Sequence, residues 1–124
     1  MQKLIILTVT LLLNMSCAFA APTEITVEGM YLRYEGGEYQ SALTPCGSFD
    51  IWRVEEKGEA YLDLLKQYKT LTHSKYGEIY IKAKGRLLPI DKGLFPDTHY
   101  SSTFTLKELL LYSSGNESPL SCKP

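Results

Sequence analysis

The chain has 124 residues, of which 44% are hydrophobic and 22% are charged, and its formal net charge is −1. A chain of this length forms one domain with a single, modest core. The balance of acidic and basic residues provides no electrostatic footprint for nucleic acid or for an anionic membrane surface, so both classes of partner are disfavoured.

The first twenty residues have the pattern of a secretory signal peptide. Lys3 supplies the positive start, an apolar run follows over 4–13, and small residues precede an expected cleavage after Ala20. The apolar run is about half as long as a membrane-spanning helix needs. A lipid anchor at Cys17 is disfavoured because Asn14 stands where a branched aliphatic residue is needed. We therefore expect a signal peptide over 1–20 and one exported, periplasmic domain over 21–124, without a transmembrane span.

The cysteines outside this signal peptide are Cys46 and Cys122. Removing the signal peptide leaves 104 residues and a net charge of −2, because it takes away one Lys and no acidic residue. An even number of cysteines in an oxidising compartment predicts a structural disulfide between the two. A redox-active pair or a soft-metal site is the alternative, but each usually requires closely spaced cysteines.

The first half of the exported segment alternates in the way that strands do. Residues 24–34 predict a long strand with a bend at Gly29, and residues 38–43 can pair back on it after a turn at 35–38. After a second turn near Cys46, residues 48–54 predict another strand with at least one buried face.

From Gly58 the apolar period changes to that of a helix, with Tyr61, Leu64 and Tyr68 on one face. Strand alternation returns over 78–88, a loop is expected over 89–101, and a last strand over 104–112 is favoured over a short helix. Residues 113–124 form a polar tail that Cys122 would hold to the body. About five strands with one helix after the third predict an OB-like small antiparallel barrel, mainly β. An open antiparallel sheet with the helix on one face is the alternative.

No catalytic or metal-binding motif stands out. The two histidines, His73 and His99, lie outside any recognisable motif, and Asp91 and Asp97 near His99 lack a second pair of ligands at metal-binding spacing. The sequence therefore predicts a protein that is not an enzyme and that needs no metal or other cofactor.

Tyrosine is in excess, with nine in the chain. The simpler interpretation is that the tyrosines and the single Trp suit half-buried strands. The alternative is that they form a stacking platform for a partner. On the second interpretation, Trp52, Tyr39 and Tyr80 are the candidate contact surface.

Several short motifs follow one another in a fixed order between residues 24 and 122. They are Thr26-Val27-Glu28-Gly29-Met30-Tyr31, Cys46-Gly47-Ser48, Ala60-Tyr61-Leu62 through Tyr68, Tyr80 to Gly85-Arg86-Leu87, and Cys122. In this order they resemble the C-terminal domain of the bacterial envelope lipoprotein family NlpE. The resemblance implies an OB-type barrel in a Gram-negative envelope, with one disulfide at positions corresponding to Cys46 and Cys122.

Proteins of that family are associated with copper homeostasis and with sensing adhesion and lipoprotein-trafficking defects through the Cpx envelope-stress pathway. The family's N-terminal barrel with its C-x-x-C pair has no counterpart in this sequence, so the resemblance does not carry copper binding over. We expect a periplasmic, non-catalytic module that acts by protein contact in envelope stress or homeostasis. The alternative is a barrel that binds an oligosaccharide or a peptide through exposed Tyr and Trp.

Overall fold

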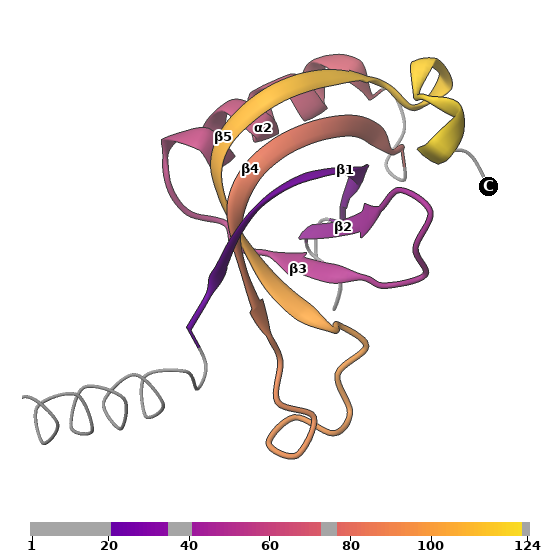
Figure 1. Ribbon diagram of the computed structural model, residues 1–124. Helices are drawn as coiled ribbons and strands as arrows, with labels where there is room; N and C mark the ends of the chain where they lie inside the picture. The colour runs from indigo at the N-terminus through magenta and orange to yellow at the C-terminus, as the bar shows by residue number, and fades with distance from the viewer. Residues whose placement is uncertain (1–20, 35–40, 73–76, 123–124) are drawn as a thin grey trace, which may run out of the picture.

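The computed structural model describes residues 21–34, 41–72 and 77–122 (Figure 1). The expected signal peptide, the expected turn over 35–38, Tyr39 and His73 lie outside the described residues. The elements are β1 (Thr23–Arg33), β2 (Ser41–Pro45), β3 (Trp52–Val54), α2 (Glu59–Leu71), β4 (Ile79–Pro89), β5 (Ser102–Ser114) and the 3₁₀ turns η1 (Gly115–Glu117) and η2 (Leu120–Cys122).

The five strands form a closed barrel in the order β1-β2-β3-β5-β4. Neighbouring strands are antiparallel, except that β3 and β5 run parallel through three residue pairs. The single described α-helix, α2, lies between β3 and β4 in the chain. This arrangement confirms the predicted OB-like barrel and rules out the open sheet.

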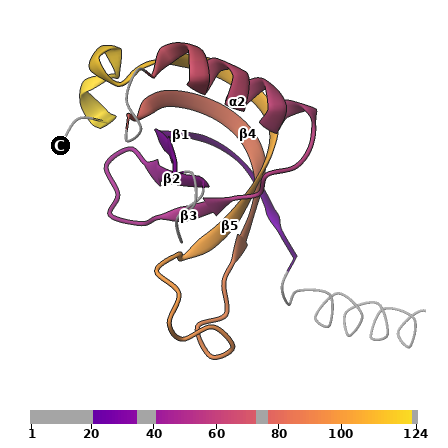
Figure 2. The ribbon, with the colours of Figure 1, turned by 180° about the vertical axis from the view of Figure 1, so that it is seen from behind.

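The long strand β1 takes part in two pairings because it curves (Figures 1 and 2). Its residues 23–31 pair with β4, and its residues 29–33 pair with β2. Gly29 lies where the second pairing begins, and a Cβ at this position would approach the carbonyl oxygen of Thr44 to 2.7 Å. A side chain there would push β2 away, which explains why the expected bend falls on a glycine.

The core fills the barrel beneath α2. Tyr61, Leu64 and Tyr68 share the buried face of the helix, at the helical spacing that the sequence predicts. They pack in one cluster with strand residues such as Tyr31 and Phe104, both of which are fully buried. Among the described residues, no helix combines the length and the apolar composition that crossing a membrane requires.

Several expected boundaries differ from the structure; β1 and β4 are each shifted by one residue, and β2 ends at Pro45, two residues later than expected. Residues 48–51 are not part of β3, because Ser48 and Asp50 make turn hydrogen bonds and Phe49 is fully exposed. The last strand is confirmed but is longer than expected and ends at Ser114. The expected polar tail is therefore two short 3₁₀ turns that follow β5 directly.

Candidate functional site

The candidate site is a groove of about 430 Å³ beside the loop that joins β4 to β5, which we call the loop groove. Arg53 of β3 lies at one side of it, and Leu88 at the end of β4 lies at the other. The loop itself contributes Ile90, Phe95 and Tyr100. In Figure 1 this loop, in orange, extends away from the barrel below β3.

The loop is held in one shape by its own hydrogen bonds. The Asp91 carbonyl oxygen accepts from the amides of Leu94 and Phe95 at 3.2 and 2.9 Å, and the Asp91 side chain accepts from the Gly93 amide at 2.8 Å. The Lys92 ammonium donates to the carbonyl oxygen of Thr98 at 2.7 Å. Because these bonds already hold the loop in one shape, the loop loses little conformational entropy when its side chains bind a partner.

The side chains that this loop presents are apolar. Leu94 is 72% exposed and Phe95 is 60% exposed, and Leu88, which lines the groove together with Phe95, is 40% exposed. Large apolar side chains that gather at one exposed place mark contact sites more often than single ones do. The loop groove can therefore hold an apolar group, and the exposed guanidinium of Arg53 can pair with an anion beside it.

Two of the residues expected to form a contact surface are buried instead. Trp52 is 8% exposed and packs on Phe104, with ring centroids 5.8 Å apart. Tyr80 is 6% exposed, and its hydroxyl donates to the Glu28 carboxylate at 2.6 Å. Both are correctly placed on strands, but alternation alone did not show that Trp52 faces the barrel interior. The third expected contact residue, Tyr39, lies outside the described residues.

The environment of Tyr80 changes its acidity. Burial, together with the hydrogen bond and the negative charge of Glu28, raises the pKa of Tyr80 to about 12. This hydroxyl therefore stays protonated at neutral pH and serves as a donor that ties β4 to β1.

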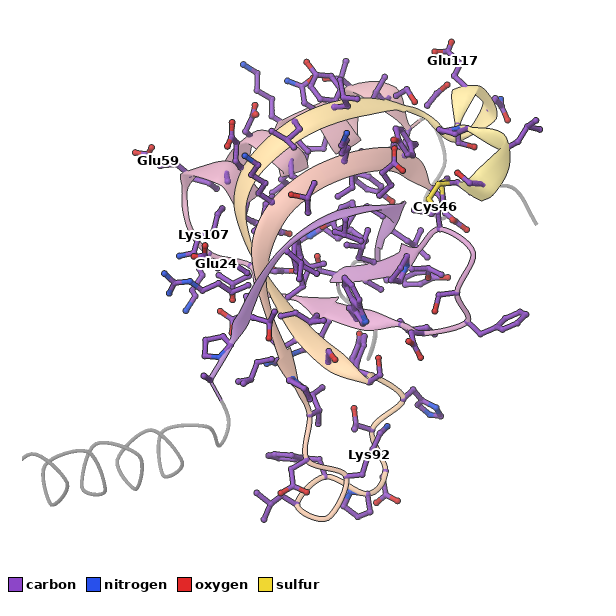
Figure 3. All side chains as sticks on the ribbon, viewed as in Figure 1. Glu24, Cys46, Glu59, Lys92, Lys107 and Glu117 are labelled. Carbon is purple, nitrogen blue, oxygen red and sulfur yellow. A yellow bond between two sulfur atoms is a disulfide. The ribbon has the colours of Figure 1, made fainter. Side chains whose placement is uncertain are left out.

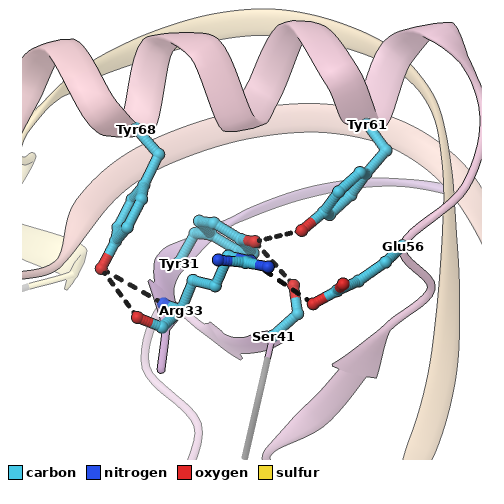
Figure 4. A network of polar contacts seen from close by, with 6 residues as sticks. All are labelled: Tyr31, Arg33, Ser41, Glu56, Tyr61 and Tyr68. Carbon is cyan, nitrogen blue, oxygen red and sulfur yellow. Dashed lines mark hydrogen bonds and ion pairs between the residues drawn. The ribbon is translucent and has the colours of Figure 1, made fainter. Parts of the chain in front are cut away.

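A second set of polar contacts lies inside the barrel under α2 (Figure 4). The Tyr31 hydroxyl is 2.6 Å from the Ser41 hydroxyl and 3.3 Å from that of Tyr61. Arg33 Nε lies 3.5 Å from a carboxylate oxygen of Glu56. The Tyr68 hydroxyl donates to the carbonyl oxygen of Gly77 at 2.7 Å.

The chemistry of this network is that of a structural clamp between α2, β1 and β2. Burial raises the pKa of Tyr31 far above its ordinary value, and its contact with Tyr61 acts in the same direction while Ser41 acts against it. A phenol that keeps its proton at every physiological pH is a poor acid or base. We therefore assign the network to stability.

The expected disulfide is present between Cys46 and Cys122, whose Cα atoms are 4.3 Å apart. The Cys46 amide donates to the carbonyl oxygen of Glu28 at 2.9 Å, so the bonded cysteine also lies against β1. The bond holds η2 to the barrel at the end where β1 and β2 meet. Figure 3 shows the yellow sulfur bond beneath the C-terminal turns.

The residues weighed for catalysis or metal binding are not gathered at the loop groove. Asp91 lines the groove, whereas Asp97 and His99 are not among its lining residues. Within the described ranges, no three side chains of His, Cys, Asp or Glu are grouped so that they could hold a metal ion.

The sequence patterns considered above did not indicate the loop groove. The signal was present in Leu94 and Phe95, two large apolar residues inside a segment that Pro and Gly mark as a loop.

Comparisons of the chain with protein-family models, with curated proteins and with solved structures found no match.

Proposed function

We propose that the protein is an exported, non-catalytic binding module of a bacterial envelope, and that it acts by contact with another protein through the loop groove. The observation that carries the proposal is the exposure of Leu94 and Phe95 on a loop that its own hydrogen bonds hold in place. Such a surface loses little entropy on binding and gains from burial of apolar area.

The proposed location has two supports. The first is the signal-peptide pattern over residues 1–20. The second is the disulfide between Cys46 and Cys122, because such bonds persist mainly in oxidising compartments. Protein sequencing of the mature chain should find Ala21 at its start, and thiol labelling without reductant should find no free cysteine. A mature chain that keeps Met1 and has free thiols contradicts the proposed export.

The proposed role in envelope stress or homeostasis is supported by the resemblance to the C-terminal domain of NlpE. The support consists of the order of short motifs, the five-strand barrel with one helix and the position of the disulfide. Deletion of the gene should change the envelope-stress response of the host. An unchanged response under adhesion and lipoprotein-trafficking stress contradicts this role.

Site-specific photo-crosslinking in cells of the natural host tests the contact surface. A photoreactive phenylalanine analogue at position 95 should give a crosslinked protein band of defined mass. The same analogue at position 49 is the matched control, because Phe49 is fully exposed but is not a lining residue of the loop groove. Equal bands from both positions, or none from position 95, contradict a contact surface at the loop groove.

A second candidate function is the binding of a small ligand such as an oligosaccharide. The observation in its favour is the volume of the loop groove, about 430 Å³, which is in the range of small-molecule sites. OB-folds also bind oligosaccharides with the loop between their fourth and fifth strands. Titration with envelope oligosaccharides, followed by NMR, would give saturable shifts at Phe95 and Tyr100 if this function is correct.

A further inference from the structure

A second hollow lies on the outside of the barrel over β1 and β2. It has a volume of about 220 Å³, and we call it the strand hollow. Its lining is mainly apolar, with a single carboxylate from Glu78; the other residues include Met30, Leu32, Tyr34, Ala42 and Ile51. The larger apolar side chains of this lining are half-buried and Ala42 is buried, so the hollow leaves a contiguous apolar surface that an occupant can cover.

The strand register joins the strand hollow to the loop groove. Leu32 pairs with Ala42, Ala42 with Arg53, Arg53 with Thr103, and Thr103 with Leu88. The first two residues line the strand hollow and the last three line the loop groove. Figure 1 shows β2, β3 and the start of β5 following one another on the side toward the viewer. No strand therefore separates the two hollows, and the row follows the sheet for about 19 Å.

Arg53 lies where the two hollows meet. It is exposed, and it makes no ion pair with any residue that the structure describes. An occupant that crosses from one hollow to the other passes over this guanidinium and removes it from water. Covering a cation in this way is unfavourable unless the occupant brings an anion to it.

Both ends of the row carry a negative charge, opposite to the positive charge of Arg53. Glu78 lines the strand hollow at one end, and Asp91 lines the loop groove at the other. A polyanion such as a nucleic acid would meet repulsion at both ends and a single cation in the middle. An occupant with one central carboxylate and apolar groups on both sides matches the lining along its whole length.

We propose that the row from Leu32 to Leu88 binds an extended polypeptide segment of about six residues, with a central Asp or Glu on Arg53 and apolar side chains in the two hollows. The length follows from a rise of about 3.3 Å per extended residue. The inference rests on the proposed function, since it specifies which chemistry the contacted protein presents. In this inference Arg53 selects segments that have a central acidic residue, and the two hollows make most of the apolar contact.

Selection from a displayed library of random seven-residue peptides on the purified protein tests this inference. The enriched peptides should share one acidic residue between apolar ones, and NMR shifts on binding should include both Leu32 and Leu88. Arg53→Glu should weaken binding at least about tenfold, since a hydrogen-bonded ion pair is lost and like charges face each other. Replacing the acidic residue of the peptide by Lys should restore binding to this variant.

Arg86→Glu is the matched control, because Arg86 of β4 pairs with Glu24 of β1 and lines neither hollow. Equal weakening by the two substitutions, shifts confined to one hollow, or no enriched acidic peptide each overturn the inference. The inference is also overturned if an envelope oligosaccharide binds this row and no peptide is selected. A crosslink from position 95 in cells without an acid-centred peptide overturns only this inference. Peptide selection without a crosslink in cells overturns the proposed function instead.

Discussion

The hydroxyl of Tyr31 illustrates how a polar atom is accommodated inside the barrel. Tyr31→Phe removes the contacts with Ser41 and Tyr61 and leaves the buried Ser41 hydroxyl without its partner. We expect a loss of about 1 to 3 kcal/mol in the free energy of unfolding, measured with urea. The double variant Tyr31→Phe/Ser41→Ala should lose less than the sum of the single variants, because no hydroxyl of the pair then remains unpaired. Strictly additive losses would show that the two hydroxyls are not coupled.

Tyr80 predicts a specific loss of stability in alkaline solution. Its pKa is about 12 in the folded chain, against 10.0 ordinarily, so the contribution of its proton is fully present below pH 10. Between pH 10 and about 12 the unfolded chain has released this proton while the folded chain keeps it. The free energy of unfolding therefore falls with pH in this window. The fall should be smaller in Tyr80→Phe than in the unsubstituted protein.

Absorbance of the tyrosinate ion gives an independent measurement for Tyr80. Glu28→Gln should lower the pKa of Tyr80, because the negative charge that opposes ionisation is removed. Glu24→Gln, on the same strand and paired with Arg86, should leave it unchanged. A titration curve that is the same in all three proteins would contradict the assignment to Glu28.

At the residue scale, the sequence predicted strand membership better than orientation. Tyr80 lies between Ile79 and Ile81, and Trp52 follows Ile51, so apolar or aromatic side chains point to both faces of each strand and the sequence does not tell which face is covered. Tyr80 has Lys82 and Lys84 beyond it on β4, yet it is buried, because the bond to Glu28 gives its hydroxyl a partner. That contact joins residues 52 apart in sequence, and no local pattern contains it.

At the scale of elements, Gly85 is required by the close approach of β4 and β5. A Cβ at this position would overlap the carbonyl oxygen of Thr105 and the ring of Phe104, and one of the two irregularities in the pairing lies beside it. Gly85→Ala should therefore destabilise the barrel by about 1 to 3 kcal/mol in urea unfolding. Gly93→Ala is the control, because a Cβ there would meet only the Asp91 side chain. Equal effects of the two substitutions would contradict the close approach.

The elements themselves were largely predictable, and their partners were not. Periodicity placed the start of α2 and both ends of the long strands β1 and β4 to within one residue. It failed at residues 48–51, where alternation continues but Ser48 turns the chain by bonding to the amide of Asp50. It also could not place the loop groove. That groove depends on the parallel pairing of β3 with β5, which brings Arg53 beside a loop more than thirty residues later.

At the scale of the whole molecule, the disulfide links the first half of the barrel to the end of the chain. The linked residues are 76 apart in sequence, so the bond restricts the unfolded chain over most of the domain. Loop-closure entropy predicts a stabilisation of about 4 kcal/mol, and measured values are often lower. The double variant Cys46→Ser/Cys122→Ser should therefore unfold at a lower urea concentration than the oxidised protein, and its free energy of unfolding should be lower by up to about 4 kcal/mol.

The folded barrel should survive the loss of this bond, because the core cluster contains neither cysteine. Hydrogen exchange of the double variant should be faster mainly near η2, which the bond holds against β1. Reducing the unsubstituted protein should reproduce both effects and should leave the double variant unchanged. A reductant that destabilises the double variant equally would show that the loss has another cause. Collapse of protection throughout the barrel would show instead that the core does not sustain the fold alone, which would make the covalent link a condition of folding.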